Sequence, residues 1–256
     1  MVHHFADDTN LLHFNKSLKS LNKKVNKDLK FLWQWLNANK IALNSDKTEY
    51  VIFKHPSKPM DFEVKLSIGG KRIFPSNHIK YLGVLIDSNL NWKPQIDNIA
   101  VKLKQANGIL CKLRHMVPRK VLISIYFALF YSHLNYCAQI WGQPISIYVR
   151  RISALQNCAV RIICFADFNA PVNPLYAELG FLKFTDLIHI HNVSMIHSVY
   201  HRNLPSPLLG TFAIDFSHAY NTRASNRGYI NSQYVRTASS ALNLLDASLW
   251  SPGIIV

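Results

Sequence analysis

The chain has 256 residues, of which 49% are hydrophobic and 17% are charged. This composition allows a sizeable core and argues against a disordered protein. The formal net charge is +15, and residues 16–120 hold 21 Lys and Arg against 7 Asp and Glu. Such a field favours polyanions, with nucleic acid first and an anionic membrane surface second. A solvated basic surface that aids solubility is the alternative.

The four cysteines show no CxxC spacing and predict reduced thiols in an intracellular protein. No signal peptide is evident, and we expect a location in the nucleus, the cytoplasm or both. The apolar segment 121–142 is interrupted by His133, Asn135 and Gln139. We therefore expect it to form a buried helix, and we expect no membrane partner.

The first 92 residues predict a mixture of strands with one helix. β-Forming residues and a Gly69-Gly70 turn signal indicate the strands. We expect them at residues 9–14, at 49–53, in a hairpin over 64–74, and as one further strand over 79–87.

An amphipathic helix is expected between the first two of these strands. Apolar residues recur at spacings of three and four from Leu18 to Leu36. The opposite face carries a row of lysines that includes Lys23, Lys27 and Lys30.

After Trp92 the apolar period becomes helical. We expect helices over 93–116, 119–141, 145–165 and 185–201. The segment APVNP (170–174) breaks the pattern, and periodicity weakens from about residue 206. The sequence thus predicts an α+β fold in three parts: a mixed domain over 1–92, a helical region over 93–166, and a helical and irregular region over 167–256.

Two adjacent carboxylates, Asp7 and Asp8, end the segment FADD just before the strand expected at 9–14. In a turn between two short strands, such a pair can bind a hard divalent cation such as Mg²⁺. Two-metal phosphoryl transfer uses cations held in this way. A solvated turn or a helix N-cap explains the pair as well, so the pair alone does not decide between them.

Three segments, in this order, resemble the reverse transcriptases of non-LTR (LINE-like) retrotransposons. FADD looks like their metal-binding box, with Phe5 in place of the more usual Tyr. LNSDKTEYVIF (43–53) looks like the palm segment that follows, and YLGVLID (81–87) like the start of the primer grip. The helices after Trp92 correspond to the thumb. HAYNTRASNRGYI (218–230) is similar to the tail of these reading frames.

The resemblance implies a partial polymerase palm followed by an α-helical thumb-like region, with RNA-directed DNA polymerase activity in the family. It implies Mg²⁺ as cofactor, and an RNA template, a DNA primer and dNTPs as partners. Asp7 would be the direct metal ligand and Asp8 a second ligand or an orienting acid. Lys47 would lie near the incoming triphosphate, or would be an ordinary surface lysine.

The resemblance also implies a nucleic-acid surface. Tyr81, Leu82 and Gly83 would place a strand against the primer end, or would form a buried strand with a bulge. Phosphate contacts are expected from six lysines. These are Lys23, Lys27 and Lys30 on the first helix, and Lys102, Lys104 and Lys112 in the thumb-like region.

A palm polymerase needs a third carboxylate on an earlier strand, and only four residues precede Phe5. Two carboxylates do not readily position two cations and a triphosphate. We therefore expect a truncated reverse transcriptase with half an active site and no polymerase activity unaided. A basic nucleic-acid-binding protein without catalysis is the alternative.

Overall fold

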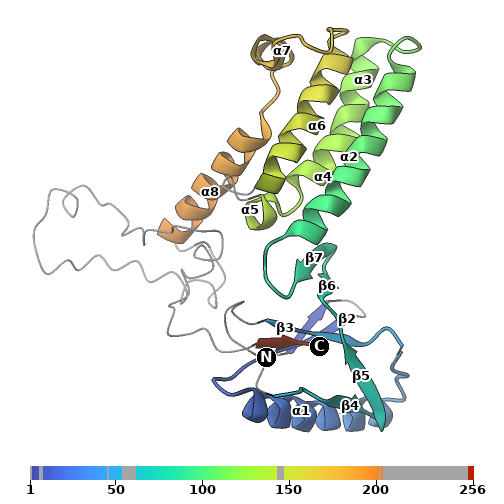
Figure 1. The fold of residues 1–256 in the computed structure, drawn as a ribbon, viewed down its shortest axis with the longest axis vertical. Helices are drawn as coiled ribbons and strands as arrows, with labels where there is room; N and C mark the ends of the chain where they lie inside the picture. The colour runs from blue at the N-terminus through green and yellow to red at the C-terminus, as the bar shows by residue number, and fades with distance from the viewer. Residues whose placement is uncertain are drawn as a thin grey trace, which may run out of the picture. The chain divides into compact units, whose positions relative to one another are not determined.

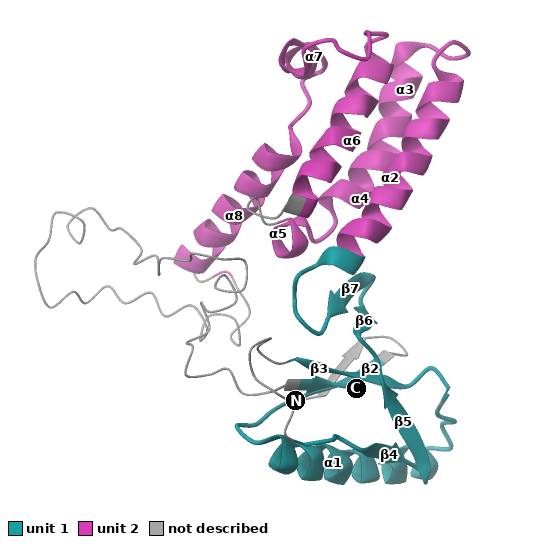
Figure 2. Ribbon diagram, viewed as in Figure 1, with its two compact units in different colours: residues 1–94, 245–256 teal, residues 95–244 magenta. Residues whose placement is uncertain are grey.

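The structure is a computed structural model of the chain, coloured from the N-terminus to the C-terminus in Figure 1. It describes residues 2–5, 8–44, 46–53, 62–142, 147–201, 203 and 253–256. Most of the region expected to be irregular from residue 206, including segment 218–230, lies outside these residues. Contacts divide the chain into two compact units, residues 1–94 with 245–256, and residues 95–244 (Figure 2). The predicted three-part division at 92 and 166 stays a prediction.

The first unit is built on a mixed sheet that runs, in the described residues, in the order β1-β2-β8-β3-β5-β4. Its strands are β1 (Val2–Phe5), β2 (Asp8–Phe14), β3 (Glu49–Phe53), β4 (Leu66–Ile68), β5 (Lys71–Pro75) and β8 (Gly253–Ile255). A separate pair is formed by β6 (His78–Tyr81) and β7 (Val84–Asp87). The C-terminal β8 thus lies between two strands from the first quarter of the chain.

The predicted amphipathic helix is confirmed as α1 (Leu18–Ala38), which ends at its cap, Asn39. Because its apolar residues recur every three or four positions, they share one face, and Leu21, Val25, Leu29 and Leu36 are buried. The helix runs along the sheet (Figure 1). It shares one core with side chains from β2, β3, β4, β5 and β8.

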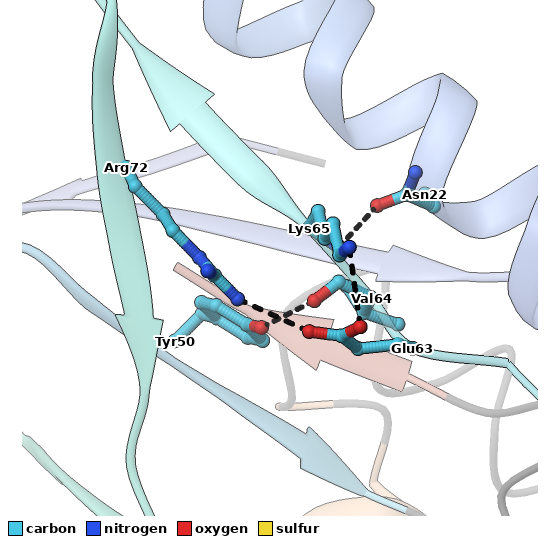
Figure 3. Close-up of polar contacts among 6 residues, drawn as sticks. All are labelled: Asn22, Tyr50, Glu63, Val64, Lys65 and Arg72. Atoms are coloured by element: carbon cyan, nitrogen blue, oxygen red, sulfur yellow. Dashed lines mark hydrogen bonds and ion pairs between the residues drawn. The ribbon is translucent and has the colours of Figure 1, made fainter.

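Two asparagines on α1 hold the edge strand of the sheet. Asn22 Oδ1 accepts a hydrogen bond from the Lys65 backbone N–H at 3.0 Å (Figure 3). Asn26 accepts from the N–H of Ser67 at 3.1 Å and donates to the Lys65 carbonyl at 2.9 Å. Backbone groups beside β4 are therefore satisfied by the helix instead of by another strand.

The Tyr50 hydroxyl and two ion pairs of Glu63 hold the segment that leads into the same strand. Buried Tyr50 donates a hydrogen bond to the Val64 carbonyl at 2.8 Å. The Glu63 carboxylate lies 3.2 Å from Lys65 Nζ and 3.1 Å from Arg72 on β5 (Figure 3). These charges are largely exposed, so they orient the segment more than they stabilise it.

The hairpin predicted over 64–74 is confirmed as β4–β5, and Gly69 and Gly70 both have positive φ, at 56° and 79°. The single strand predicted over 79–87 is wrong. The chain reverses at Leu82 (φ 45°) and Gly83 (φ 83°), so that Tyr81 pairs with Val84 and the segment forms the β6–β7 hairpin. Two consecutive left-handed residues turn a strand back on itself.

The second unit is helical. Its elements are α2 (Lys93–Leu113), α3 (Arg119–Ile125), the π-helix η1 (Tyr126–Tyr131), α4 (Ser132–Asn135), α5 (Ala138–Trp141), α6 (Ile147–Ile163), α7 (Val172–Leu179) and α8 (Phe184–Tyr200). The helices predicted at 93–116, 145–165 and 185–201 are confirmed with small shifts of their ends. None of the helices in the described ranges is long and apolar enough to cross a membrane.

The single helix predicted over 119–141 is wrong. A π-helical stretch interrupts it, and a left-handed Cys137 (φ 52°) breaks it before α5. The APVNP segment, expected to be a break, instead begins α7. Pro171 occupies the N-cap position without a capping hydrogen bond, and Pro174 lies in the first turn, where a missing N–H leaves no helical hydrogen bond unmade.

The buried side-chain amide of Gln156 connects three segments of this unit by hydrogen bonds. The side chain of Gln156 on α6 donates to the Tyr126 hydroxyl at 3.0 Å and to the Leu182 carbonyl at 2.9 Å. It also accepts from the N–H of Phe184, the first residue of α8, at 2.8 Å. Because burial disfavours the phenolate, the pKa of Tyr126 is raised to about 12.

Candidate functional site

The first two strands form a hairpin at the acidic pair. β1 and β2 are antiparallel, and Phe5 is opposite Asp8, so residues 6 and 7 connect the strands. Asp7 and the side chain of Asp8 lie outside the described part of the structure. The sequence prediction of a strand beginning just after the pair is confirmed by β2.

Some described carboxylates of the first unit already contact other groups. Asp28 on α1 lies 3.5 Å from His13 Nε2, and Asp87 holds the loop that leads to α2. Asp46 is exposed in the turn before β3. In the stretches that the structure describes, no three His, Cys, Asp or Glu side chains lie together as a metal site.

His13 is the buried polar group on β2, the strand that begins at Asp8, and it is 3% exposed. Its pKa is lowered, first by burial and then by the positive charge of the N-terminus, while Asp28 opposes the shift. The imidazole is therefore neutral at pH 7 and forms part of the core.

Three of the predicted phosphate-binding lysines lie on one ridge of α1. Lys23, Lys27 and Lys30 are exposed, and their spacing of four and three places them in one row. Leu21, Val25 and Leu29 turn the opposite face into the core, so the row is held toward solvent. We call these three lysines the α1 ridge.

Lys47 is exposed in the turn before β3, and its N–H donates to the Asn44 carbonyl at 3.2 Å. The Thr48 hydroxyl donates to the same carbonyl at 3.0 Å. The backbone of this turn is thus fixed, while the lysine side chain points to solvent. Its role near a triphosphate stays a prediction.

The residues predicted to approach the primer lie at the tip of the β6–β7 hairpin. Tyr81 is half-buried, Leu82 is 37% exposed, and Gly83 is exposed. Gly83 therefore supplies a turn conformation, and the alternative of a buried strand with a bulge is wrong. The predicted contact with a primer remains a prediction.

Asp87, at the end of β7, is a structural residue that sequence reasoning missed. It is 6% exposed, and its carboxylate accepts from the N–H groups of Asn89, Asn91 and Trp92 at 3.2, 3.3 and 2.9 Å. This cap holds two left-handed residues, Leu90 (φ 54°) and Trp92 (φ 62°). An aspartate just before a stretch rich in asparagine, before a helix, is the sequence signal that could have revealed it.

The lysines predicted on the thumb-like region do not form a single row. Lys102, Lys104 and Lys112 are all exposed on α2. Lys102 and Lys104 are two residues apart and point in different directions. Lys102 lies close enough to His133 to help lower its pKa, although burial is the larger cause.

Comparisons with known proteins point to one class. The chain is 25% identical over 164 residues to the probable RNA-directed DNA polymerase from transposon X-element of Drosophila melanogaster. It is 26% identical over 214 residues to the RNA-directed DNA polymerase from the mobile element jockey of the same species. It is 22% identical over 169 residues to the retrovirus-related Pol polyprotein from the type-1 retrotransposable element R1 of Bradysia coprophila.

These matches cover 62%, 82% and 64% of this chain, but 18%, 23% and 16% of the three relatives. The chain thus spans about a fifth of the length of the curated relatives that it matches. No protein-family model matches it, and no solved structure matches it. These three relatives confirm the resemblance of the chain to the RNA-directed DNA polymerases of non-LTR retrotransposons.

Proposed function

We propose that this chain supplies the palm hairpin, the primer-side hairpin and a thumb-like helical region of a retrotransposon reverse transcriptase. The observation that carries the proposal is the pairing of Phe5 with Asp8 in a two-stranded hairpin, because these two residues flank Asp7 in the sequence. Three relatives named as polymerases or as a Pol polyprotein of mobile elements support it. They favour this function over a basic binding protein without catalysis.

The polymerase family of these relatives typically uses a divalent metal. We propose that Asp7 and Asp8 hold Mg²⁺ here, because adjacent carboxylate oxygens suit a hard cation. When bound, such an ion lowers the pKa of an attacking hydroxyl or stabilises a leaving oxygen. In this proposal the β1–β2 hairpin orients the two acids, because the pairing of β1 with β2 fixes the backbone position of Asp8 at the start of β2.

We further propose that the chain alone binds a template–primer duplex without extending the primer. Asp87 accepts three backbone N–H groups, so this acid is committed to the loop before α2. The α1 ridge, Lys47 and the α2 lysines are the proposed contacts to phosphates or to the incoming dNTP, and Tyr81–Gly83 the contact to the primer.

A salt series tests the binding proposal. Fluorescence anisotropy measures the affinity of the chain for an RNA template annealed to a DNA primer, and phosphate contacts make log K fall linearly with log[salt]. A Lys23→Gln/Lys27→Gln variant is expected to lower that slope by about 2, one for each lost phosphate contact. A Lys40→Gln/Lys120→Gln variant removes the same charge from two exposed lysines that are not among the proposed contacts, and it is the matched control.

Equal slopes for the two double variants would contradict a role for the α1 ridge.

Primer extension with Mg²⁺ is expected to give no incorporation by the chain alone. Incorporation that disappears in an Asp7→Asn variant would show that the chain is a complete polymerase and that this part of the proposal is wrong.

A further inference from the structure

The last residues of the chain form a central strand of the first unit. β8 is antiparallel to β2, with Leu12 opposite Ile255, and antiparallel to β3, with Val51 opposite Ile255. Leu11 and Val256 exchange both backbone hydrogen bonds, at 3.0 and 3.1 Å. A short strand is thus paired on both sides.

β2 and β3 are parallel to each other, because each is antiparallel to β8. The chain passes from β2 through α1 to β3 and leaves a space one strand wide between them. We call this space the β2–β3 slot. Without an occupant, both facing strands would present unpaired N–H and C=O groups, which is the arrangement that recruits another strand.

An empty slot would also leave a cavity in the core of the first unit. Ile254 is fully buried and Val256 is 9% exposed, and both belong to the core that includes Leu11, Leu29 and Tyr50. Ile255 faces the opposite side of the sheet, since neighbouring residues of a strand alternate. The slot therefore selects an extended segment with apolar residues at alternate positions.

The occupant is short and comes from far along the chain. β8 has three residues, whereas β2 has seven. Residues 201–252 separate it from α8 in the sequence, so β8 is not positioned by a short connection to the preceding helix. The same segment of a second copy offers identical side chains and an identical register, and strand addition to an open edge is an established mode of association.

We propose that the β2–β3 slot is a strand-acceptor site and that β8 is its exchangeable occupant. In a single chain, residues 253–256 fill the slot. At higher concentration, the C-terminal segment of a second copy replaces it and links two chains by strand exchange. The strand-acceptor site is independent of the proposed polymerase role of the chain.

Disulfide trapping tests the exchange in the full chain. Leu12 and Ile255 are directly opposite, and they lie beside the Leu11–Val256 hydrogen-bonded pair, so they form a closely spaced pair without mutual hydrogen bonds. Oxidation of a Leu12→Cys/Ile255→Cys variant is expected to give an internal 12–255 disulfide in dilute solution. In concentrated mixtures of isotope-labelled and unlabelled chains, peptide mapping is expected to find the same disulfide between labelled and unlabelled chains.

A Leu12→Cys/Ile254→Cys variant is the matched control, because Ile254 is opposite His13 and faces the other side of the sheet. Absence of any 12–255 disulfide, or equal trapping in the control, would overturn the placement of β8 in the slot. A disulfide that stays internal at every concentration would overturn the exchange.

A peptide-binding measurement tests the acceptor site separately. A labelled synthetic peptide of residues 251–256 is expected to bind the full-length Ile254→Asp chain at least about tenfold more tightly than the wild-type chain, since a buried carboxylate weakens the resident strand. The same peptide carrying Ile254→Asp is expected not to bind. Equal binding to both chains, or no binding to a folded Ile254→Asp chain, would overturn the proposal; if that variant does not fold, the disulfide result decides.

Discussion

Asn26 on α1 acts as the hydrogen-bond partner of Ser67 at the edge of the sheet, accepting from its backbone N–H at 3.1 Å. The same side chain donates to the Lys65 carbonyl at 2.9 Å. One asparagine therefore contacts backbone on both sides of Leu66, as a neighbouring strand would.

Replacing this asparagine should weaken the first unit. An Asn26→Ala variant leaves a donor and an acceptor of the edge segment without their helix partner, and we expect a loss of about 1–2 kcal/mol in the free energy of unfolding. Urea unfolding followed by circular dichroism measures it. Ser20→Ala, at an exposed position of the same helix, should change stability by less than about 0.5 kcal/mol; similar losses in the two variants would count against the edge contact.

The two glycines of the β4–β5 turn should respond differently to alanine. Both have positive φ, so each substitution costs about 1 kcal/mol in backbone strain. A Cβ at Gly69 would also lie 2.7 Å from the ring of Trp33, whereas a Cβ at Gly70 meets no described atom within 4 Å. Gly69→Ala should therefore lower the melting temperature more than Gly70→Ala, and the reverse order would contradict the packing of Trp33 on this turn.

The buried amide of Gln156 should be a major stabilising group of the helical unit. Gln156→Met keeps a similar volume but leaves the N–H of Phe184 and the carbonyl of Leu182 without this partner. We expect a loss of about 2–4 kcal/mol, since each unsatisfied buried group costs about 1–3 kcal/mol. Thermal unfolding measures it, with Gln139→Met at an exposed position of α5 as control. Equal melting temperatures for the two variants would refute the network.

Stability should depend on pH through His13. Burial lowers its pKa in the folded state below the usual value of 6.5, so the unfolded chain binds the proton more readily. The stabilisation is therefore complete above about pH 6.5 and is lost as the pH falls toward the folded pKa. Urea midpoints between pH 7.5 and 5 should fall less in His13→Phe than in the wild type. His78→Phe, at an exposed site, should retain the wild-type slope, and an unchanged slope in His13→Phe would contradict the prediction.

Local patterns predicted a large part of the fold. α1 followed from apolar residues at helical spacing, and the β4–β5 hairpin followed from Gly69-Gly70. The α1 ridge of the candidate site followed from the same period, because lysines opposite a buried face must be exposed.

Long-range and strained features could not be predicted in this way. β8 has no local signal, since three residues form a strand there only by pairing with β2 and β3. The β6–β7 turn depends on Leu82 in a left-handed conformation that this residue type rarely adopts. The break before α5 likewise depends on a left-handed Cys137, within a run that is otherwise apolar and helical in period.

The central claim is that the β1–β2 hairpin presents Asp7 and Asp8 to a divalent cation. Electron paramagnetic resonance measures it most directly, with Mn²⁺ in place of Mg²⁺, because carboxylates suit both ions. In the presence of template–primer duplex, the full chain is expected to bind Mn²⁺. Asp7→Asn or Asp8→Asn should weaken that binding by about tenfold or more, and Asp46→Asn should leave it unchanged. Equal Mn²⁺ binding by all four chains would contradict the account.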